Sequence, residues 1–362
     1  MTPEKNSAAL AADLRDALAD AAAGLGPVRI MHVCGTHEHE LGRYALRTLL
    51  PENVRLIAGP GCPVCITPAS AIATVLKLAA LAPRPIICAY GDIVRVPIAP
   101  GSLAEARAGG ADVRIVYGPR EAAKLAAETP GRPVIFFSIG FETTAAPVAA
   151  LMLSDLPKNF FLYCCHRWVP TAVAALAADP EGRVDGYLLP GHACVISGSD
   201  AYNFLPERYG KAAAVAGFDP ADILAALVSI VRQLRDHQPT VANCYPRAVS
   251  GPGNPKAREL LDRVFAVTDA AWRGIGVLPG TGLTPRPEFQ RLDPLAHFGM
   301  TEVSAEDIMP GCSCHLVMLG RREPEECGLF SRACAPDHPR GPCMVGSEGA
   351  CRARYLYPGG PG

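Results

Sequence analysis

The sequence predicts an α/β protein with two open, mostly parallel α/β domains, followed by a loop-rich C-terminal domain. Three observations support this fold class. Short β-branched or aromatic runs alternate with alanine-rich stretches of helical length, and many of these runs end in glycine-rich turns. Prolines and glycines then become dense after about residue 246. Runs that are apolar throughout are typical of strands that helices cover on both faces of a parallel sheet.

The individual elements follow from these patterns. Helices are predicted over residues 8–24, 69–81 and 221–234. Strands are predicted over residues 28–33, 54–58, 85–89, 113–117, 134–139, 160–163, 186–189 and 213–216. Eight alternating strands could also close into one barrel, but the prolines at residues 130–133 divide the runs evenly and favour two open domains.

We therefore expect a first α/β domain over residues 1–130, a second over 131–245 and a C-terminal domain over 246–362. Six of the fourteen cysteines lie between Cys312 and Cys351, amid short prolyl turns. Such a segment has too little apolar material to fold unaided, so we expect a metal centre to hold it together.

Charge and hydropathy narrow the function classes. The chain has 362 residues, with 34 Lys+Arg against 35 Asp+Glu, so no field of one sign favours nucleic acid or an anionic membrane as a partner. Hydrophobic residues make up 49% of the chain, which excludes disorder as the main state. The opening residues do not resemble a signal peptide, and no apolar stretch approaches bilayer length. We expect a cytoplasmic protein, in which many cysteines indicate metal or redox chemistry.

Polar residues gather directly after the predicted strands. Open parallel sheets bind ligands at the carboxyl ends of their strands, and a glycine-rich turn before a helix stabilises anions and thiolates. The motifs at these ends are Cys34-Gly-Thr-His37, Gly59-Pro-Gly-Cys62-Pro-Val-Cys65, Gly91-Asp92, Gly140-Phe-Glu142, His166 and Gly191-His192-Ala-Cys194.

Two of these turns carry thiol chemistry. Cys34 and His37 lie within one helical turn, and a soft thiolate beside imidazole suits low-valent iron or another transition metal. The alternative is that Cys34 is simply a buried core residue. Cys62 and Cys65 have the spacing of a redox dithiol whose thiol pKa a helix N-terminus lowers. Half of a zinc knuckle, or two packed thiols, is the alternative for this pair.

The last four cysteines are Cys327, Cys334, Cys343 and Cys351, separated by six, eight and seven residues. Well-spaced thiolates on loops favour an iron–sulfur cluster over a zinc ribbon, which prefers paired knuckles. Zinc and unligated core cysteines remain the alternatives. Cys312 and Cys314 are too close together to fit this spacing, so we interpret them as a second dithiol or as part of the cluster pocket.

The motifs occur in an order that closely resembles the hydrogenase maturation protein HypD family, from about residue 28 to about 357. The resemblance rests on Cys-Gly-Thr-His, Gly-Pro-Gly-Cys-Pro-Val-Cys, Gly-Phe-Glu-Thr-Thr, Pro-Gly-His-Ala-Cys and the tail Gly-Pro-Cys-Met-Val-Gly-Ser-Glu-Gly-Ala-Cys. It implies a scaffold on which the Fe(CN)2CO group of NiFe hydrogenase is assembled, with a HypC-like chaperone and a HypE-like cyanide donor as partners.

The resemblance also implies roles for single residues. Cys34 would hold iron together with a cysteine of the HypC-like protein, and His37 would shape that site. Cys62 and Cys65 would be the redox pair, and a 4Fe-4S cluster would be bound by Cys327, Cys334, Cys343 and Cys351. The remaining matches to polar positions of the family motifs are Asp92, Glu142, His192 and Glu348.

Two other functions stay open at this point: a stand-alone iron–sulfur thiol/disulfide oxidoreductase, and a zinc-stabilised interaction protein. An electron path from cluster to iron requires the dithiol to face the C-terminal domain. We therefore predict that Cys62 and Cys65 lie beside the cluster cysteines, and that Cys34 opens into the same cleft.

Overall fold

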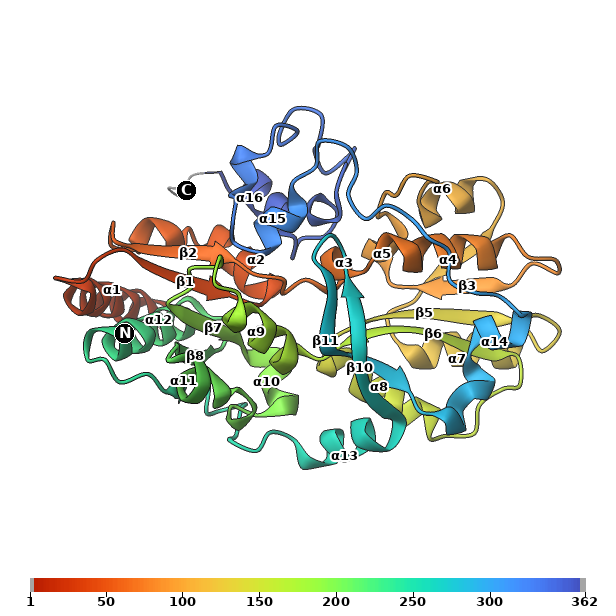
Figure 1. Cartoon of the computed structure of the whole chain (residues 1–362), viewed down its shortest axis with the longest axis horizontal. Coiled ribbons are helices and arrows are strands. Elements are labelled where there is room, and N and C mark those ends of the chain that lie inside the picture. The colour runs from red at the N-terminus through yellow and green to blue at the C-terminus, as the bar shows by residue number, and fades with distance from the viewer. Residues whose placement is uncertain (1–2, 359–362) are drawn as a thin grey trace.

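The structure, a computed structural model, describes residues 3–358 and contains two open sheets (Figure 1). Sheet A is parallel throughout and has the order β2 (Val54–Ala58), β1 (Val28–His32), β7 (Gly186–Pro190), β8 (Ala212–Ala216), β9 (Val241–Asn243). Sheet B has the order β10 (Phe265–Trp272), β11 (Gly276–Pro285), β6 (Phe160–Arg167), β5 (Val134–Gly140), β3 (Ile86–Ala89), β4 (Asp112–Ile115). Its β10 and β11 are antiparallel and the rest is parallel. The predicted fold class is confirmed, and the barrel alternative is wrong.

All eight predicted strands are present, with ends that differ by a few residues at most. They could be predicted because their side chains are apolar on both faces, as in β5 and β7, which are buried throughout. The expectation that the C-terminal domain over residues 246–362 is loop-rich is wrong over residues 265–285. There β10 and β11 form a hairpin that is partly exposed and interrupted by glycine and proline, so it presents no apolar run.

Strand order does not follow chain order. β3 pairs with β5, with Ile86 opposite Val134, so residues 130–133 fall between two strands of one sheet and do not separate two sheets. The even division of the strands that we expected at residues 130–133 is corrected accordingly. The chain crosses between the sheets three times, through α3 (Pro63–Ile66) and α4 (Ala69–Ala79), through α9 (Val169–Ala178), and through α13 (Pro255–Val264).

Helices cover both faces of each sheet, which explains the apolar strands. On sheet A, α1 (Pro3–Ala22), α2 (Gly35–Arg43) and α12 (Pro220–Arg235) pack on one face, and α9, α10 (Gly191–Ser197) and α11 (Phe204–Tyr209) on the other. On sheet B, α7 (Pro119–Glu128), α8 (Glu142–Met152) and α13 oppose α4, α5 (Gly91–Val94), α6 (Leu103–Ala108) and α14 (Pro294–Phe298). Each fully buried leucine or isoleucine contributes about 1.5–3 kcal/mol. Short 3-10 helices occur at Leu46–Leu49, Asp200–Tyr202 and Pro287–Leu292.

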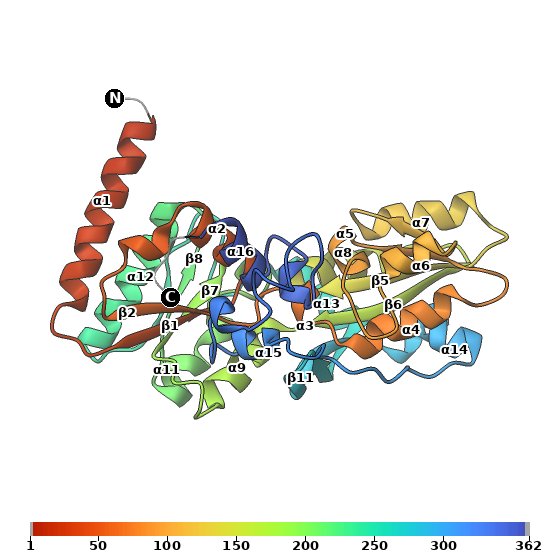
Figure 2. The ribbon, with the colours of Figure 1, turned by 90° about the horizontal axis from the view of Figure 1, so that it is seen from above.

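The cysteine-rich segment, residues 312–358, lies over the junction of the two sheets (Figures 1 and 2). Its regular elements are short: α15 (Cys314–Met318), η4 (Pro324–Glu326), η5 (Pro342–Met344) and α16 (Ala350–Leu356). Glu323 ties the segment to itself and to sheet A, because its carboxylate pairs with Arg354 at 3.0 Å and with Arg55 at 3.1 Å. Within residues 3–358, no helix combines the length and apolar character that crossing a bilayer requires.

Candidate functional site

Cys34 follows β1 and caps the N-terminus of α2, where its backbone is extended. The Gly35 N–H donates to the Gly61 carbonyl at 3.0 Å, which holds this turn against the turn after β2. Burial raises the pKa of the Cys34 thiol to about 11, although the backbone N–H groups of His37 and Thr36 lower it. Cys34 is therefore a protonated thiol that a metal ion can convert to a thiolate, and the N–H groups at the helix start would stabilise that anion.

His37 lies fully buried in the first turn of α2. Its Nε2 donates to the Gly217 carbonyl at 2.9 Å, which leaves the lone pair on Nδ1. Within the described residues that Nδ1 atom has no hydrogen-bond partner. Burial lowers the pKa of His37 to about 3, so the ring is a neutral imidazole at physiological pH. Such a ring can bind a metal as a neutral ligand through Nδ1.

Phe218 joins His37 to His192, and sequence reasoning did not select it as a site residue. The Phe218 ring lies 4.9 Å from the His37 ring and 3.9 Å from the His192 ring, between centroids. Its place directly after β8, in one of the turns at the carboxyl ends of the strands, is the signal that could have identified it. His192 is exposed, and burial lowers its pKa while the nearby Glu348 carboxylate raises it.

Glu348 reaches this site from the cysteine-rich segment. Thr36 Oγ1 donates to Glu348 Oε1 at 2.7 Å, although the two residues are 312 positions apart. A Cβ on Gly35 would lie 2.5 Å from the Glu348 Cβ, so glycine is what allows the approach. The site around Cys34 is therefore completed by the C-terminal end of the chain.

Glu142 and Cys194 form a buried group next to Cys34. Glu142 Oε1 accepts a hydrogen bond from the Val169 N–H at 3.2 Å, whereas its Oε2 has no partner within residues 3–358. Burial raises the pKa of Glu142 to about 8. Burial, the Glu142 carboxyl group and the Cys34 thiol all raise the pKa of Cys194. Both groups are protonated at neutral pH, so this wall of the site carries no charge.

Asp92 is not brought into this group. Its carboxylate pairs with Arg95 at 2.7 Å and is partly exposed. On its other side a Cβ on Gly346 would lie 2.5 Å from Asp92 Oδ2. Asp92 therefore contacts the cysteine-rich segment at Gly346, which lies two positions before Glu348 in the sequence.

Cys62 caps the N-terminus of α3 and Cys65 lies within this helix, directly after the turn that contacts Cys34. Their Sγ atoms are 2.6 Å apart, and the Cys65 N–H donates to Cys62 Sγ at 3.3 Å. Both thiols are buried and free. Burial raises the pKa of Cys65, whereas hydrogen bonding to the Cys343 side chain lowers it. The dithiol thus touches the cysteine-rich segment directly.

The six cysteines of that segment surround one hollow. Its lining consists of Cys312, Cys314, Cys327, Cys334, Cys343 and Cys351 with Leu329, Phe330, Gly341 and Met344. A Cβ on Gly341 would lie 2.6 Å from Cys312 Sγ, and the Arg340 N–H donates to Cys334 Sγ at 3.2 Å. Thiolate donors, apolar walls and N–H groups directed at sulfur fit an iron–sulfur cluster. Among residues 3–358, no three His, Cys, Asp or Glu side chains converge as ligands of a single ion.

The structure brings the Cys62/Cys65 pair beside the cysteine-rich segment, because α3 packs on η5 and Cys65 and Cys343 belong to one buried cluster. Gly61, next to Cys62, contacts the Cys34 turn because β1 and β2 are adjacent and parallel. That Cys34 opens into the same cleft as the dithiol stays a prediction.

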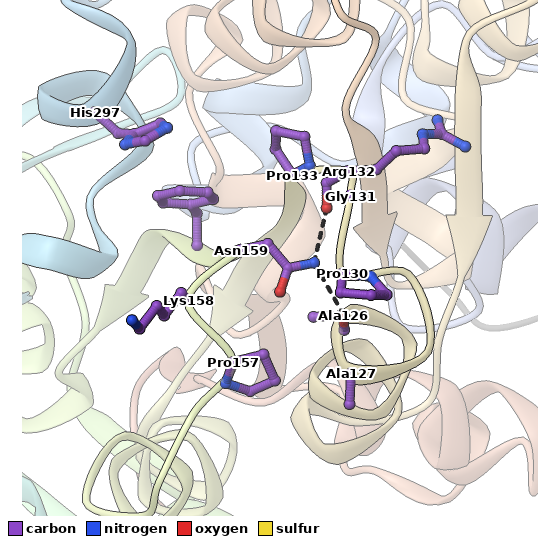
Figure 3. A pocket seen from close by; sticks show the side chains of 11 residues that line it. Ala126, Ala127, Pro130, Gly131, Arg132, Pro133, Pro157, Lys158, Asn159 and His297 are labelled. Carbon is purple, nitrogen blue, oxygen red and sulfur yellow. Dashed lines mark hydrogen bonds between the residues drawn. The ribbon is translucent and has the colours of Figure 1, made fainter.

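A larger hollow of about 660 Å³ lies at the opposite edge of sheet B, before the starts of β5 and β6 (Figure 3). Asn159, in the loop before β6, holds the loop between α7 and β5 in place. Its Nδ2 lies 2.8–2.9 Å from the carbonyl oxygens of Ala126, Thr129 and Arg132. Ligands of parallel sheets bind at the carboxyl ends of strands, so we do not assign the functional site to this hollow.

The fold and the site together define a class: an α/β protein in which two sheets meet at a thiol-rich centre. The sequence matches the family described as "HypD: Hydrogenase formation hypA family" over residues 9–358, and the chain belongs to this family. The resemblance deduced from the motifs is therefore confirmed.

Several relatives align over most of their length. The sequence is 42% identical over 342 residues to hydrogenase maturation factor HypD2 of Bradyrhizobium diazoefficiens. The alignment covers 91% of this chain and 90% of that protein. It is 43% identical over 339 residues to hydrogenase maturation factor HypD of Azotobacter vinelandii, and 42% over 336 residues to that of Escherichia coli K12. In both cases the alignment covers 91% of this chain and 89% of the relative.

Proposed function

We propose that this chain is a hydrogenase maturation factor that holds iron at Cys34 while the Fe(CN)2CO group is assembled. The observation that carries the proposal is the continuous contact from Cys34 through the Cys62/Cys65 pair to the cysteine pocket. The names of the relatives, hydrogenase maturation factors, support the coarser part of the proposal, a role in hydrogenase maturation. We place this activity in the cytoplasm, where thiols stay reduced.

The iron is the substrate of this reaction and is held by the Cys34 thiolate. Iron binding displaces the Cys34 proton to solvent, because the low pKa of His37 keeps its ring neutral, and the Nδ1 lone pair of His37 offers a further ligand to the metal. The neutral Glu142 and Cys194 groups keep competing negative charge away from the site. The exposed His192 and the partly exposed Glu348 lie on the open side, where a HypC-like chaperone and a HypE-like cyanide donor would approach.

A 4Fe-4S cluster in the cysteine pocket would be held by Cys327, Cys334, Cys343 and Cys351. When bound, it would supply electrons one at a time. Cys62 and Cys65 lie between this pocket and Cys34, and as a dithiol they can store two electrons and release two protons on oxidation.

Infrared spectra of the complex with the two partners test the iron site. Wild-type protein is expected to show bands of iron-bound CO and CN⁻, and Cys34→Ala is expected to lose them while its cluster content stays unchanged. Cys88→Ala, at a buried thiol within β3, is the matched control and should keep the bands. Wild-type bands in the Cys34→Ala complex would refute Cys34 as the iron ligand.

A second function, a stand-alone iron–sulfur thiol/disulfide oxidoreductase, is favoured by the contact between Cys65 and Cys343. It predicts turnover on a protein disulfide without any partner, and Cys34→Ala should then have full activity. Iron and sulfide analysis of anaerobically purified protein distinguishes both functions from a zinc-stabilised interaction protein.

A further inference from the structure

The turn between β10 and β11 contains a fully buried guanidinium, that of Arg273. Its Nε donates to the Asp307 carbonyl at 2.7 Å and its Nη2 to the Pro97 carbonyl at 3.1 Å. Within the described part of the chain, Nη1 has no hydrogen-bond partner. The Asp307 carboxylate is occupied by two backbone N–H groups, of Ala69 at 2.7 Å and Gly274 at 2.9 Å. Among the described residues, the Arg273 side chain therefore hydrogen-bonds neutral carbonyl oxygens, and the Asp307 carboxylate acts on it through space without a direct bond. A buried charge that is not paired directly is unfavourable.

The turn of residues 273–275 contacts both the helix of the dithiol and the helix that begins at Cys314. The Arg273 N–H donates to the carbonyl of Ile66 at 2.9 Å, and Ile66 directly follows Cys65. On the other side, a Cβ on Gly274 would lie 2.8 Å from the Cβ of His315, the neighbour of Cys314. The Arg273 backbone thus contacts one thiol-bearing helix, and the next residue contacts the other.

The charge of Arg273 and the sulfurs of the pocket affect each other. Burial lowers the pKa of Arg273, whereas the Cys314 thiol, Asp307, Cys312 and Cys343 raise it. Three of these four groups line the hollow of the cysteine-rich segment. The interaction is mutual, so the guanidinium also favours negative charge on these sulfurs.

We propose that Arg273 supplies the counter-charge of the cysteine pocket and thereby raises the reduction potential of the cluster bound there. The inference rests on the proposed cluster. Reduction adds one electron and no proton to the pocket, so a fixed cation beside it stabilises the reduced form more than the oxidised form. None of the motif residues named in the sequence analysis is proposed as this counter-charge.

Three variants test the proposal. Arg273→Met removes the charge and keeps most of the side-chain length, and Arg273→Lys keeps the charge. Arg167→Met is the matched control, because Arg167 is also buried and also binds carbonyl oxygens, those of His166 and Ala271. Each protein is purified anaerobically, analysed for iron and sulfide, and titrated with EPR detection of the cluster.

We expect Arg273→Met to shift the one-electron equilibrium at least tenfold toward the oxidised cluster, a decrease of about 59 mV. Arg273→Lys should shift it less, and Arg167→Met should not shift it. A wild-type potential in Arg273→Met would overturn the proposal.

If Arg273→Met fails to retain its cluster, Arg273→Lys decides, because a retained charge should retain the cluster. Loss of the cluster in Arg273→Lys as well, with Arg167→Met intact, would show that only the hydrogen bonds of Arg273 matter and would overturn the proposal. Wild-type protein without iron and sulfide would refute the proposed cluster, and this inference with it.

Discussion

Cys34 and the buried titratable groups Glu142 and His37 are uncharged at neutral pH because the protein interior disfavours ions. Burial raises the pKa of Cys34 to about 11 and that of Glu142 to about 8, and lowers that of His37 to about 3. At neutral pH these three groups are a thiol, a carboxylic acid and a neutral imidazole. The site therefore acquires a negative charge only when a cation replaces the Cys34 proton, which favours metal binding over attack by the free thiol.

Glu142 gives a test of this environment through pH. Its folded-state pKa of about 8 lies above the ordinary value of 4.5, so the folded state holds the proton more tightly. The stability that this proton contributes is complete below pH 4.5 and is lost as the pH rises through 8, by about 1.4 kcal/mol per pH unit between these values. Glu142→Gln stays neutral, so its unfolding free energy in urea, relative to wild type, should rise from pH 6 to pH 8.

The exposed Glu52→Gln serves as the control and should follow wild type at every pH. Parallel curves for Glu142→Gln and wild type would mean that Glu142 is ionised in the folded protein.

At this scale, local spacing selected Cys34, His37 and the Cys62/Cys65 pair as candidate site residues, and the structure brings their two turns together. It could not place the partners that complete the site. Glu348 meets Thr36 across 312 positions, and a contact of that kind leaves no periodic signal in one sequence. The same holds for the turn of Arg273, where Gly274 lies against His315.

Among the elements, the turns after the strands determine how closely the thiol groups approach. Gly61 lies so close to the backbone of Val33 and Cys34 that a side chain there would overlap with it. The strands before these turns were predictable because they are apolar on both faces. The hairpin β10–β11 was not, because burial along β10 varies from residue to residue and β11 contains glycine and proline.

Gly61→Ala is expected to destabilise the protein by about 1–3 kcal/mol, the usual penalty for an overpacked interior. It should also displace the Cys34 turn and weaken iron binding. Gly26→Ala is the matched control, because nothing lies within 4 Å of a Cβ at that exposed position, and it should change stability by less than about 0.5 kcal/mol. Urea unfolding measures both; equal stability of the two variants would contradict the close approach at Gly61.

For the whole molecule, the cysteine-rich segment joins the two sheets. Glu323, Arg55 and Arg354 hold it to sheet A, and Cys343 and Arg95 hold it to α3 and α5, since Arg95 Nη2 donates to the Val345 carbonyl at 3.0 Å. The position of this segment could not be predicted, because its loops carry no periodic pattern and its contacts are with residues far away in the chain.

Replacing any one of Cys327, Cys334, Cys343 or Cys351 with alanine should lower the iron content and increase hydrogen exchange across residues 312–358, because the loops lose the group that orders them. Cys312→Ala should do less. All six cysteines line the same hollow, so the comparison is between equivalent positions. If Cys312→Ala abolishes the visible absorbance of the cluster while Cys351→Ala retains it, the choice of four ligands is wrong.

The interleaving of the two sheets also affects how the chain is synthesised. β1 pairs with β2 on one edge and with β7 on the other, and β7 begins only at residue 186. At ordinary translation rates the ribosome needs on the order of ten seconds to add the residues between β2 and β7. During that time one edge of β1 in the nascent chain stays uncovered, and an uncovered apolar edge is a template for aggregation. Slow translation or early release before β7 emerges should therefore reduce the yield of folded protein more than any delay after residue 243.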